Sequence, residues 1–297
     1  MNFSTLIKFL SRLGFTLFVA FAGVATSGEV PVHFAVTDLE GIEQIQREFG
    51  GFRDRLAEET GLAIEFYPVA NRTAAVEAMN AKKVDFVLTG PAEYVVFRKR
   101  TKAIPVLGFS RPDYFGAIVV LAESGIARVA DLKDKKVALG PVGSTSKHLA
   151  PVQILKDGGL TPGIDVHILH TSVELGWEAL KRADVAAFGV TNDKFLKLRD
   201  METSMPPGSF RVIARGPDLP NDALLARADL NRSIAAKVRE GILKHSQALI
   251  AEILKGEDNQ KYRGMTFLMN IKDSDYDYVR AMYATAGYPK FASFIGE

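Results

Sequence analysis

The stretch Val137-Ala-Leu-Gly-Pro-Val-Gly-Ser-Thr-Ser-Lys-His-Leu-Ala-Pro151 carries the strongest signal for fold and function in this chain. It reads as a short apolar strand, a glycine-containing loop, three consecutive hydroxyl residues and the start of a helix. The start of a helix exposes unpaired backbone N–H groups and the positive end of the peptide dipole. Three hydroxyl groups add movable donors at the same point. The stretch therefore predicts a site that suits a tetrahedral oxyanion and requires no catalytic group.

Residues 1–27 have the pattern of a secretory signal peptide. Lys8 and Arg12 give a positive start, and an apolar run without charge follows. Small residues at 25–27 offer a cleavage site, and 20–22 are a second candidate. The apolar run is short for a membrane span, which needs roughly 20 residues, although an uncleaved anchor is the alternative. We therefore expect cleavage, export to the periplasm and a soluble mature protein.

Composition excludes several classes of function. The chain has 37 basic and 35 acidic residues; residues 1–27 contain two of the basic ones and no acidic one, so the mature chain is formally neutral. Neutrality argues against a nucleic-acid-binding protein. The absence of cysteine excludes disulfides, thiolate metal ligands and a cysteine nucleophile, and fits a periplasmic chain stabilised by its core. His167 and His170 lie three apart on a predicted strand and point to opposite faces, so we expect neither a metal site nor a cofactor.

Strand-like and helix-like segments alternate along the mature chain, which predicts an α/β fold with mostly parallel sheets between layers of helices. The predicted strands are residues 32–36, 63–67, 84–88, 104–108, 117–121, 137–139, 166–169, 185–188 and 212–215. The predicted helices are residues 44–60, 73–81, a helix from Pro91, and 129–132, 146–156, 174–181, 231–255 and 275–287.

An internal similarity links the two halves of this pattern. Residues 74–89 resemble residues 175–190 at an offset of 101, with Glu77 opposite Glu178. Each copy runs helix, basic turn, apolar strand and polar loop. A chance likeness between α/β units is the alternative, but the similarity favours two related lobes. Ligands of open α/β sheets bind beyond the carboxyl ends of the strands, so two such lobes would share one cleft.

Several short motifs occur in a characteristic order. The most specific is Gly-Ser-Thr-Ser at 143–146, followed by Leu149 and Pro151. The supporting segments are 84–85, 90–94, 130–137, 219–222 and 227–230. In this combination the chain resembles the periplasmic phosphonate-, phosphite- and phosphate-binding proteins of ABC importers, the PhnD-like family. The resemblance extends over most of the mature chain.

The resemblance implies the α/β fold of a type II periplasmic binding protein, with two lobes joined by two hinge crossovers. Each lobe is a mostly parallel sheet flanked by helices. We place the crossings near 114–121 and 210–216. Lobe one then comprises residues 28–116 with 216–297, and lobe two comprises residues 117–215.

The resemblance also implies that Ser144, Thr145 and Ser146 hold the oxyanion. Where the family often has a tyrosine at a helix start of lobe one, this chain has Arg72, which can donate two hydrogen bonds. Where the family usually has a histidine in lobe two, this chain has Val173. The resemblance therefore implies the class of ligand, an oxyanion, better than it implies the particular ligand.

Two acids complete the residues that the resemblance singles out. Asp193 and Asp222 fall near acids that receive an amino group in phosphonate binders, whereas the aspartate usual in the second-lobe strand is Ala186 here. Thr89 and Tyr94 flank the predicted start of the helix at Pro91. The predicted ligand-binding set is Ser144, Thr145, Ser146, Arg72, Thr89, Tyr94, Asp193 and Asp222.

Each of these residue types also has a purely structural interpretation. Serine and threonine often cap helices, although three hydroxyls in a row exceed what one cap needs. The arginine could be a surface charge or an ion pair between lobes, the two acids could cap loops, and the tyrosine could belong to the core. Lys147 and His148 could support the anion or point outward.

We therefore predict a periplasmic solute-binding protein that captures a small oxyanion, a phosphonate or related phosphorus oxyanion, for the permease of an ABC importer. We expect a monomer. Alternatively, the partner that recognises the closed form is the periplasmic domain of a sensor kinase. The changed pocket residues also leave room for another oxyanion such as arsenite. A hydrolase is disfavoured, because His148 lies two residues after Ser146 on a helix and points elsewhere, and no carboxylates are spaced for two metals.

Overall fold

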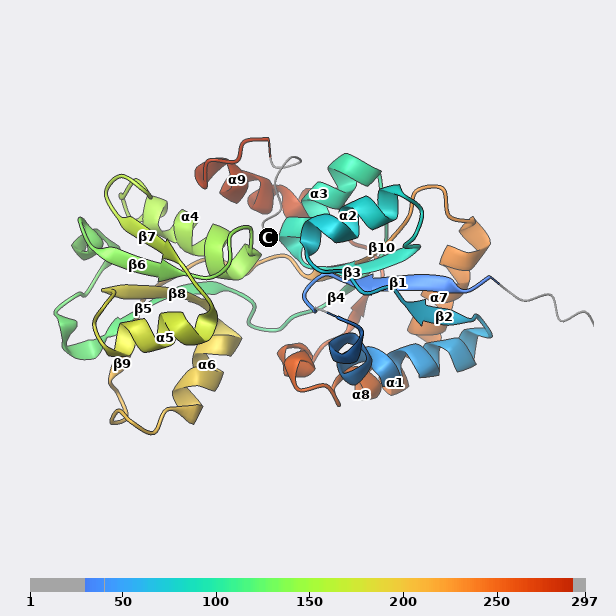
Figure 1. Ribbon diagram of the computed structural model, residues 1–297, viewed down its shortest axis with the longest axis horizontal. Helices are drawn as coiled ribbons and strands as arrows, with labels where there is room; N and C mark the ends of the chain where they lie inside the picture. The colour runs from blue at the N-terminus through green and yellow to red at the C-terminus, as the bar shows by residue number, and fades with distance from the viewer. Residues whose placement is uncertain (1–29, 40, 291–297) are drawn as a thin grey trace, which may run out of the picture. The chain divides into compact units, whose positions relative to one another are not determined.

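Two β-sheets organise the chain, and both arise from the strand–helix alternation of the sequence (Figure 1). The computed structural model describes residues 30–39 and 41–290, and the predicted signal peptide at 1–27 lies outside the described residues. The two sheets with flanking helices confirm the predicted α/β fold.

The first sheet has the strand order β11-β4-β10-β3-β1-β2. Its strands are β1 (Val32–Val36), β2 (Ile64–Phe66), β3 (Phe86–Thr89), β4 (Ile104–Phe109), β10 (Asp222–Ala226) and β11 (Phe267–Leu268). Strands β1, β2 and β3 are parallel, whereas β10 runs antiparallel to both of its neighbours. The parallel strands therefore end at one edge of the sheet, where a ligand of an open α/β sheet binds.

Helices cover both faces of the first sheet. One face packs against α1 (Ile42–Thr60), α7 (Arg232–Lys244) and α8 (Ser246–Ile253), in a core that includes Phe34, Phe52 and Phe86. The other face packs against α2 (Arg72–Asn80), α3 (Pro91–Thr101) and α9 (Asp277–Thr285), in a core that includes Val87 and Tyr94. Burial on both faces explains why these strands read as nearly continuous apolar runs.

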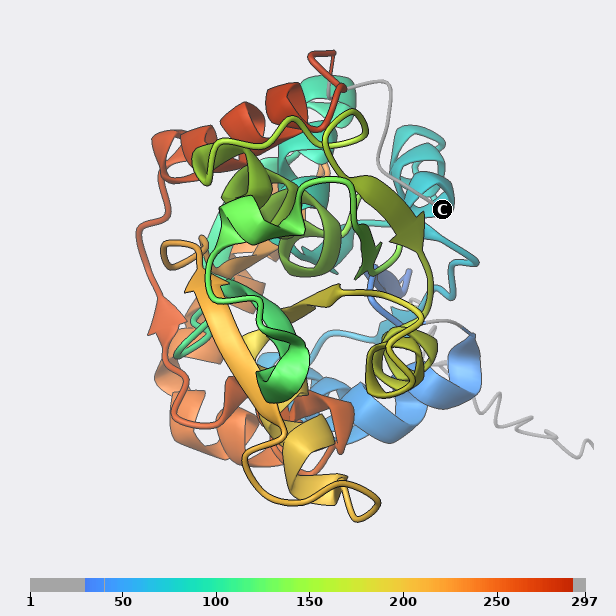
Figure 2. The same ribbon diagram turned by 90° about the vertical axis from the view of Figure 1, so that its left-hand side faces the viewer.

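The second sheet has the order β7-β6-β8-β5-β9, and its elements are nearest the viewer in Figure 2. Its strands are β5 (Gly116–Leu121), β6 (Lys136–Leu139), β7 (His167–His170), β8 (Ala187–Thr191) and β9 (Phe210–Arg215). Helix α4 (Ala150–Asp157) packs on one face, and α5 (Val173–Lys181) and α6 (Asn192–Met201) pack on the other. Short helical turns η1 (Ala122–Ser124), η2 (Val129–Leu132) and η3 (Thr145–Leu149) join the strands and helices.

The chain passes from the first sheet to the second between β4 and β5 and returns between β9 and β10. The two passages run side by side, because the N–H of Leu219 donates to the carbonyl of Tyr114 at 2.7 Å. Asn221 reinforces this contact, since its side-chain oxygen accepts from the N–H of Arg111 at 2.8 Å. These bonds place residues 110–115 beside residues 216–221.

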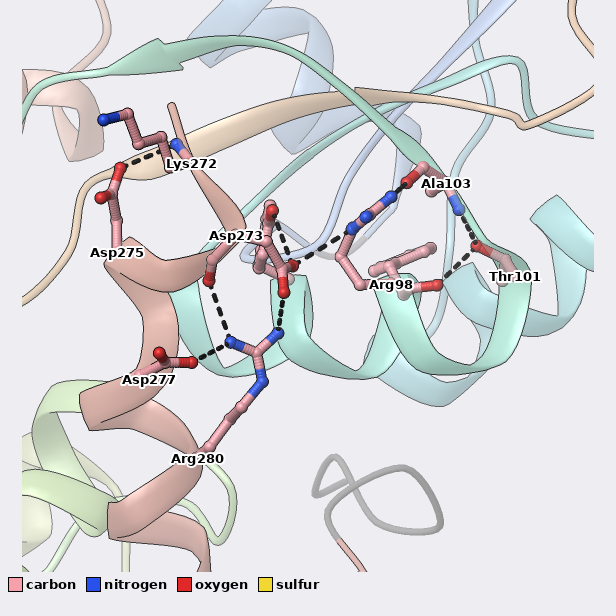
Figure 3. Close-up of polar contacts among 10 residues, drawn as sticks. Arg98, Thr101, Ala103, Lys272, Asp273, Asp275, Asp277 and Arg280 are labelled. Carbon is pink, nitrogen blue, oxygen red and sulfur yellow. Dashed lines mark hydrogen bonds and ion pairs between the residues drawn. The ribbon is translucent and has the colours of Figure 1, made fainter. Parts of the chain in front are cut away.

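The C-terminal segment ties helices of the two sheets together. It contains η4 (Asp258–Tyr262), η5 (Asp273–Tyr276) and α9. Asp273 accepts hydrogen bonds from Tyr94 and Arg98 of α3, at 3.2 Å each, and from Arg280 of α9 at 2.8 Å (Figure 3). At the end of α9, Thr285 lies 3.5 Å from the ammonium group of Lys156 on α4. Helix α9 therefore contacts a helix of each sheet.

The structure departs from the sequence prediction at several elements, among them the two-residue strand β11, which was not predicted. Helix α6 was not predicted, because only Phe195 of its residues is buried and its apolar pattern is weak. Strand β10 was not predicted, and it places Asp222 at the start of a buried strand instead of in a loop. The helix predicted over 146–156 begins with the wider turn η3, and the helix predicted over 231–255 breaks at His245, whose backbone leaves the helical conformation.

The internal similarity of the sequence corresponds to a repeated structural unit. Helix α2 spans 72–80 and helix α5 spans 173–181, so both ends keep the offset of 101. Their caps also correspond, because Asn71 accepts from the N–H of Ala74 at 2.8 Å and Ser172 accepts from the N–H of Leu175 at 3.2 Å. Strands β3 and β8 then begin at 86 and 187. The same unit therefore occurs once in each sheet.

Candidate functional site

A cavity of about 70 Å³ lies where the carboxyl ends of strands from both sheets meet. A single water molecule needs roughly 10–15 Å³ of such space, so the cavity has room for a small ion and not for an extended substrate. Its lining residues are Asp38, Arg72, Gly90, Glu93, Arg111, Tyr114, Ser144, Thr145, Ser146, Lys147, Thr191, Asp193, Lys194 and Lys261. The structure therefore brings Arg72, Asp193 and the three hydroxyl residues together.

Four helix starts surround this cavity. Arg72 is the first residue of α2, Gly90 precedes α3, Ser144 precedes η3, and Thr191 precedes α6. The last three follow directly on β3, β6 with its loop, and β8. Each helix start directs unpaired N–H groups and the positive end of its dipole outward. Their convergence favours a negative guest even before side-chain charges are considered.

The hydroxyl residues lie in a loop that ends in a turn of π-helix. The N–H groups of His148 and Leu149 both donate to the carbonyl of Ser144, at 3.1 and 2.9 Å. The N–H groups of Thr145, Ser146 and Lys147 come before this first bonded group, so they are the unpaired donors of a helix start. Turns of this width recur at functional sites. The residues 144–147 thus present backbone donors and hydroxyls at the same place.

Two of the three hydroxyls already have a partner. Ser146 Oγ lies 3.0 Å from Thr191 Oγ1, a bond between neighbouring helix starts of the second sheet. Thr145 Oγ1 accepts from the N–H of Ala92 at 2.9 Å, a bond between the two sheets' helices. Gly90 has no side chain with which to cap α3, and Thr145 supplies that cap. Because Thr145 uses its oxygen as the acceptor, its O–H remains able to donate to a guest.

Arg72 pairs with two acids, the buried Glu93 of α3 and the more exposed Asp38 that follows β1. It contacts Glu93 through its Nε atom, and it lies 3.7 Å from Asp38. Burial alone would lower the pKa of Arg72, but Glu93 and Asp38 raise it, so the guanidinium stays charged. Burial raises the pKa of Glu93 to about 7, against the opposing effect of Arg72. Burial acts in the same direction on Asp38, but Lys261 and Arg72 outweigh it and hold the pKa of this carboxyl well below its usual range.

Arg111 comes from the first passage between the sheets, and the sequence prediction missed it. Its side chain is only 8 % exposed, and its guanidinium lies 3.6 Å above the ring of Tyr114. Asp222 and Asp193 lie at 3.6 and 3.9 Å, beyond hydrogen-bond distance, and the buried Nε has no hydrogen-bond partner. Burial alone would lower its pKa, but Asp222 and Tyr114 raise it. Arg111 therefore offers a permanent charge with donors to spare.

Three lysines complete the electrostatics of the cavity. Lys261 lies 3.4 Å from Asp38, and Lys194 is in the first turn of α6. Burial lowers the pKa of Lys147, more than the nearby charge of Asp38 raises it. Among the described lining residues, the five cationic side chains outnumber the carboxylates by two. The side chains therefore reinforce the preference of the helix starts for an anion.

Three residues of the predicted set do not line the cavity. Thr89 Oγ1 lies 3.1 Å from Thr37 Oγ1 inside the first sheet. Tyr94 stacks on Tyr276 with ring centroids 3.6 Å apart. Asp222 is 2 % exposed, and its Oδ2 atom accepts from a tyrosine hydroxyl at 2.6 Å. Asp222 is linked to the cavity through the lining residue Arg111, whose guanidinium lies 3.6 Å away.

The missed lining residues differ in the sequence signal they offered. Lys147 directly follows the hydroxyl run, a position from which a cation could support the anion. Asp38 and Arg111 lie in connecting segments and Lys261 in the short helical turn η4, far apart in the sequence and without a motif. Within the described part of the chain, no group of three His, Asp or Glu residues is placed to hold a metal ion. Over the same residues, no helix is both long and apolar enough to cross a bilayer.

Two sheets flanked by helices, joined by two passages, with a cavity where their strands end, define the two-lobe fold of a type II periplasmic binding protein. The chain belongs to the family described as ABC transporter, phosphonate, periplasmic substrate-binding protein, which it matches over residues 34–276. The protein is therefore a phosphonate-type substrate-binding protein of ABC transporters and not an enzyme. The family predicted from the sequence is confirmed.

Solved structures share the fold. PhnD1 of Prochlorococcus marinus, in complex with methylphosphonate, is 16% identical, with a TM-score of 0.68 and coverage of 86% of this chain and 98% of that one. A binding protein component of an ABC phosphonate transporter from Pseudomonas aeruginosa is 17% identical, with a TM-score of 0.65 and 88% of each chain covered. The aliphatic sulphonate-binding protein SsuA of Escherichia coli is 16% identical, with a TM-score of 0.58 and coverage of 90% and 89%.

Proposed function

We propose that this chain captures a small phosphorus oxyanion in the cavity and delivers it to the permease of an ABC importer. One observation supports this most strongly: Arg111, with donors to spare, faces the same cavity of about 70 Å³ as residues 144–147, which we call the hydroxyl turn. A guanidinium provides paired donors that match the geometry of such an anion. The small volume favours a phosphonate with a short substituent, or phosphite or phosphate.

The proposed contacts come from three parts of the chain. Lobe two contributes the hydroxyls of 144–146 and the N–H groups of 145–147. Lobe one contributes Arg72, and the first passage contributes Arg111. Asp193 contacts a protonated or cationic part of the ligand, while Asp222 acts through Arg111. Thr89 and Tyr94 support the first-lobe wall from behind and do not touch the ligand.

Capture requires that the closed form bind the ligand better than the open form. We propose lobe one as residues 28–116 with 216–297 and lobe two as residues 117–215, hinged at the two passages. A ligand held by Arg72 on one side and by the hydroxyl turn on the other contacts both lobes only when they are closed. That difference in affinity drives closure. The bond from Ala92 to Thr145 adds to the stability of the closed form.

The remaining parts of the proposal concern location and partners. Residues 1–27 direct secretion to the periplasm and are removed, and the mature chain acts as a monomer. The closed form is read by an ABC permease, and membership of a transporter family favours that reader over a sensor kinase. Arsenite and other oxyanions remain competitors for the same donors and belong in the test.

A ligand screen tests the proposal. The mature protein is titrated with phosphate, phosphite, methylphosphonate, aminoethylphosphonate, sulfate and arsenite, and its thermal unfolding is followed. A ligand at 100 times its Kd should raise the free energy of unfolding by about 2.7 kcal/mol. We expect a shift with at least one phosphorus oxyanion, confirmed by calorimetric titration. No shift with any of them at millimolar concentration would refute the proposal.

A further inference from the structure

Backbone hydrogen bonds close the loop that leads into the hydroxyl turn. The N–H of Gly140 donates to the carbonyl of Lys147 at 2.8 Å, and the N–H of Ser144 donates to the carbonyl of Pro141 at 3.1 Å. Between these backbone bonds, Gly143 takes a φ of +86°, a region that glycine adopts without strain. Residues 140–147 are therefore a closed loop whose shape decides where the donors of 145–147 point.

Two imidazole rings make further hydrogen bonds to this loop. The N–H of Gly143 donates to Nδ1 of His148 at 2.9 Å, and Nδ1 of His170 lies 2.9 Å from the carbonyl of Gly140. The two rings meet edge to face, with centroids 4.7 Å apart. The loop is thus pinned at two points by a pair of contacting histidines, one on η3 and one at the end of β7.

The partners of these rings determine their tautomers. A backbone N–H can only donate, so Nδ1 of His148 carries no proton and the ring is neutral with its proton on Nε2. A carbonyl can only accept, so Nδ1 of His170 carries its proton. Burial, together with the neighbouring His170, lowers the pKa of His148 to about 3, which keeps the ring neutral at physiological pH. The bond to Gly143 is therefore available wherever the protein is folded near neutral pH.

We propose that His148 is a positioning residue for oxyanion binding, holding Gly143 so that the N–H groups of Thr145 to Lys147 converge on the guest. The inference rests on the proposed function, and it adds a residue that does not touch the ligand and does not line the cavity. His148 is 4 % exposed. Without its ring, the Gly143 N–H loses its acceptor in a buried setting, and the peptide before Gly143 turns to find another.

The experiment compares three substitutions in the mature protein. H148L removes the acceptor. H148N keeps an oxygen close to the place of Nδ1 and should restore the bond. H167N changes an exposed histidine of the same strand as His170 and serves as the matched control. We measure Kd for methylphosphonate and phosphate, the exchange protection of the Gly143 amide, and the thermal midpoint of each variant.

We expect H148L to weaken binding about tenfold and to lose the protection of the Gly143 amide, while H148N recovers most of both. H167N should match the wild type. In the wild type, the nitrogen NMR spectrum should show Nδ1 of His148 without a proton. Rescue by asparagine separates positioning from simple filling of the core, because leucine and asparagine both change the packing and only asparagine restores the acceptor.

Two results would overturn the inference. One is unchanged oxyanion affinity in a folded H148L protein. The other is fast exchange of the Gly143 amide in the wild type, which would show that the bond to His148 is absent whatever the ligand. A wild type that protects Gly143 but binds no phosphorus oxyanion would instead refute the proposed function, and the loss of that protection in H148L would still assign His148 as the residue that shapes the loop.

Discussion

The repeated units of the two lobes share their architecture and differ in what they present to the cavity. Helices α2 and α5 correspond at an offset of 101, yet Arg72 lines the cavity while its counterpart Val173 is buried in the core beside Trp177. The starts of α3 and α6 correspond in the same way, and their third residues are Glu93 and Lys194. One scaffold thus presents opposite charges at equivalent positions, so the repeat fixes where these side chains stand and the individual residues fix the charges that line the cavity.

The largest expected effect concerns a residue outside both units, Arg111. R111A should weaken phosphorus oxyanion binding about 100-fold, in the range of a lost charge-assisted hydrogen bond of about 1.5–3 kcal/mol. The substitution also leaves Asp193 and Asp222 without their cation, which adds repulsion. Calorimetric titration measures the loss. R215A is the control, because Arg215 stacks on Phe115 at 3.7 Å but does not line the cavity. A loss of affinity below threefold would show that the two repeated units bind the oxyanion without Arg111.

The next effect concerns the bond that joins the units. T145V removes a donor to the ligand and the acceptor for the Ala92 N–H, and it should weaken binding about tenfold because a buried donor loses its partner. T145S keeps both groups and should bind as the wild type does. Small-angle scattering with saturating ligand should find T145V more open. Equal affinity of T145V and wild type would contradict the role of this hydroxyl.

Because the pKa of Glu93 is raised, we expect the free energy of unfolding to depend on pH through this residue. We expect no such dependence through its counterpart Lys194. Folding raises the pKa of Glu93 from 4.5 to about 7, so between these values the folded state keeps a proton that the unfolded state has released. The free energy of unfolding of the wild type, relative to E93Q, should therefore fall as pH rises through this window, by up to about 1.4 kcal/mol per pH unit, and level off above pH 7.

Urea unfolding at several pH values from 5 to 8 measures this difference. K194Q removes no carboxyl at the equivalent position, so it should retain the pH dependence of the wild type. A difference between wild type and E93Q that stays flat or rises between pH 5 and 7 would contradict the raised pKa.

The smallest effect separates the two caps. N71A and S172A each remove a side-chain oxygen that accepts from the third N–H of a helix, and each should cost about 1 kcal/mol of stability. Only N71A should also weaken oxyanion binding, about twofold, because α2 begins with Arg72 and α5 begins with the buried Val173. Thermal unfolding and calorimetry measure the two quantities. Equal binding losses would mean that lobe closure, and not the start of α2, transmits the change.

The sequence predicted the common scaffold well. Apolar strands, helix periodicity and the similarity between residues 74–89 and 175–190 depend on local composition and spacing, and those features survive in the structure. It predicted the polar connections less well. Helix α6 buries only Phe195, so it lacks an apolar period, and β10 reads Asp-Ala-Leu-Leu-Ala, without the β-branched or aromatic residues that favour strands.

The residues of the candidate site differ in the same way: some have a local sequence pattern and others do not. The sequence predicts the three hydroxyl residues of the site, Ser144, Thr145 and Ser146, because they stand together between a strand and a helix. Thr89 and Tyr94 stand equally close to a strand end, but their side chains turn into the first lobe. The direction of a side chain at a helix start depends on how that helix packs, and packing involves distant segments such as α9.

By itself, the sequence of this protein determined the alternation of strands and helices, the repeated unit and the hydroxyl turn, since each is a property of neighbouring residues. Only the tertiary structure decided which charges share the cavity. Lys261 meets Asp38 across 223 residues of sequence, and Arg111 enters from a passage between the sheets. Such contacts form because folding brings distant segments of the chain together. A local sequence pattern therefore cannot predict them.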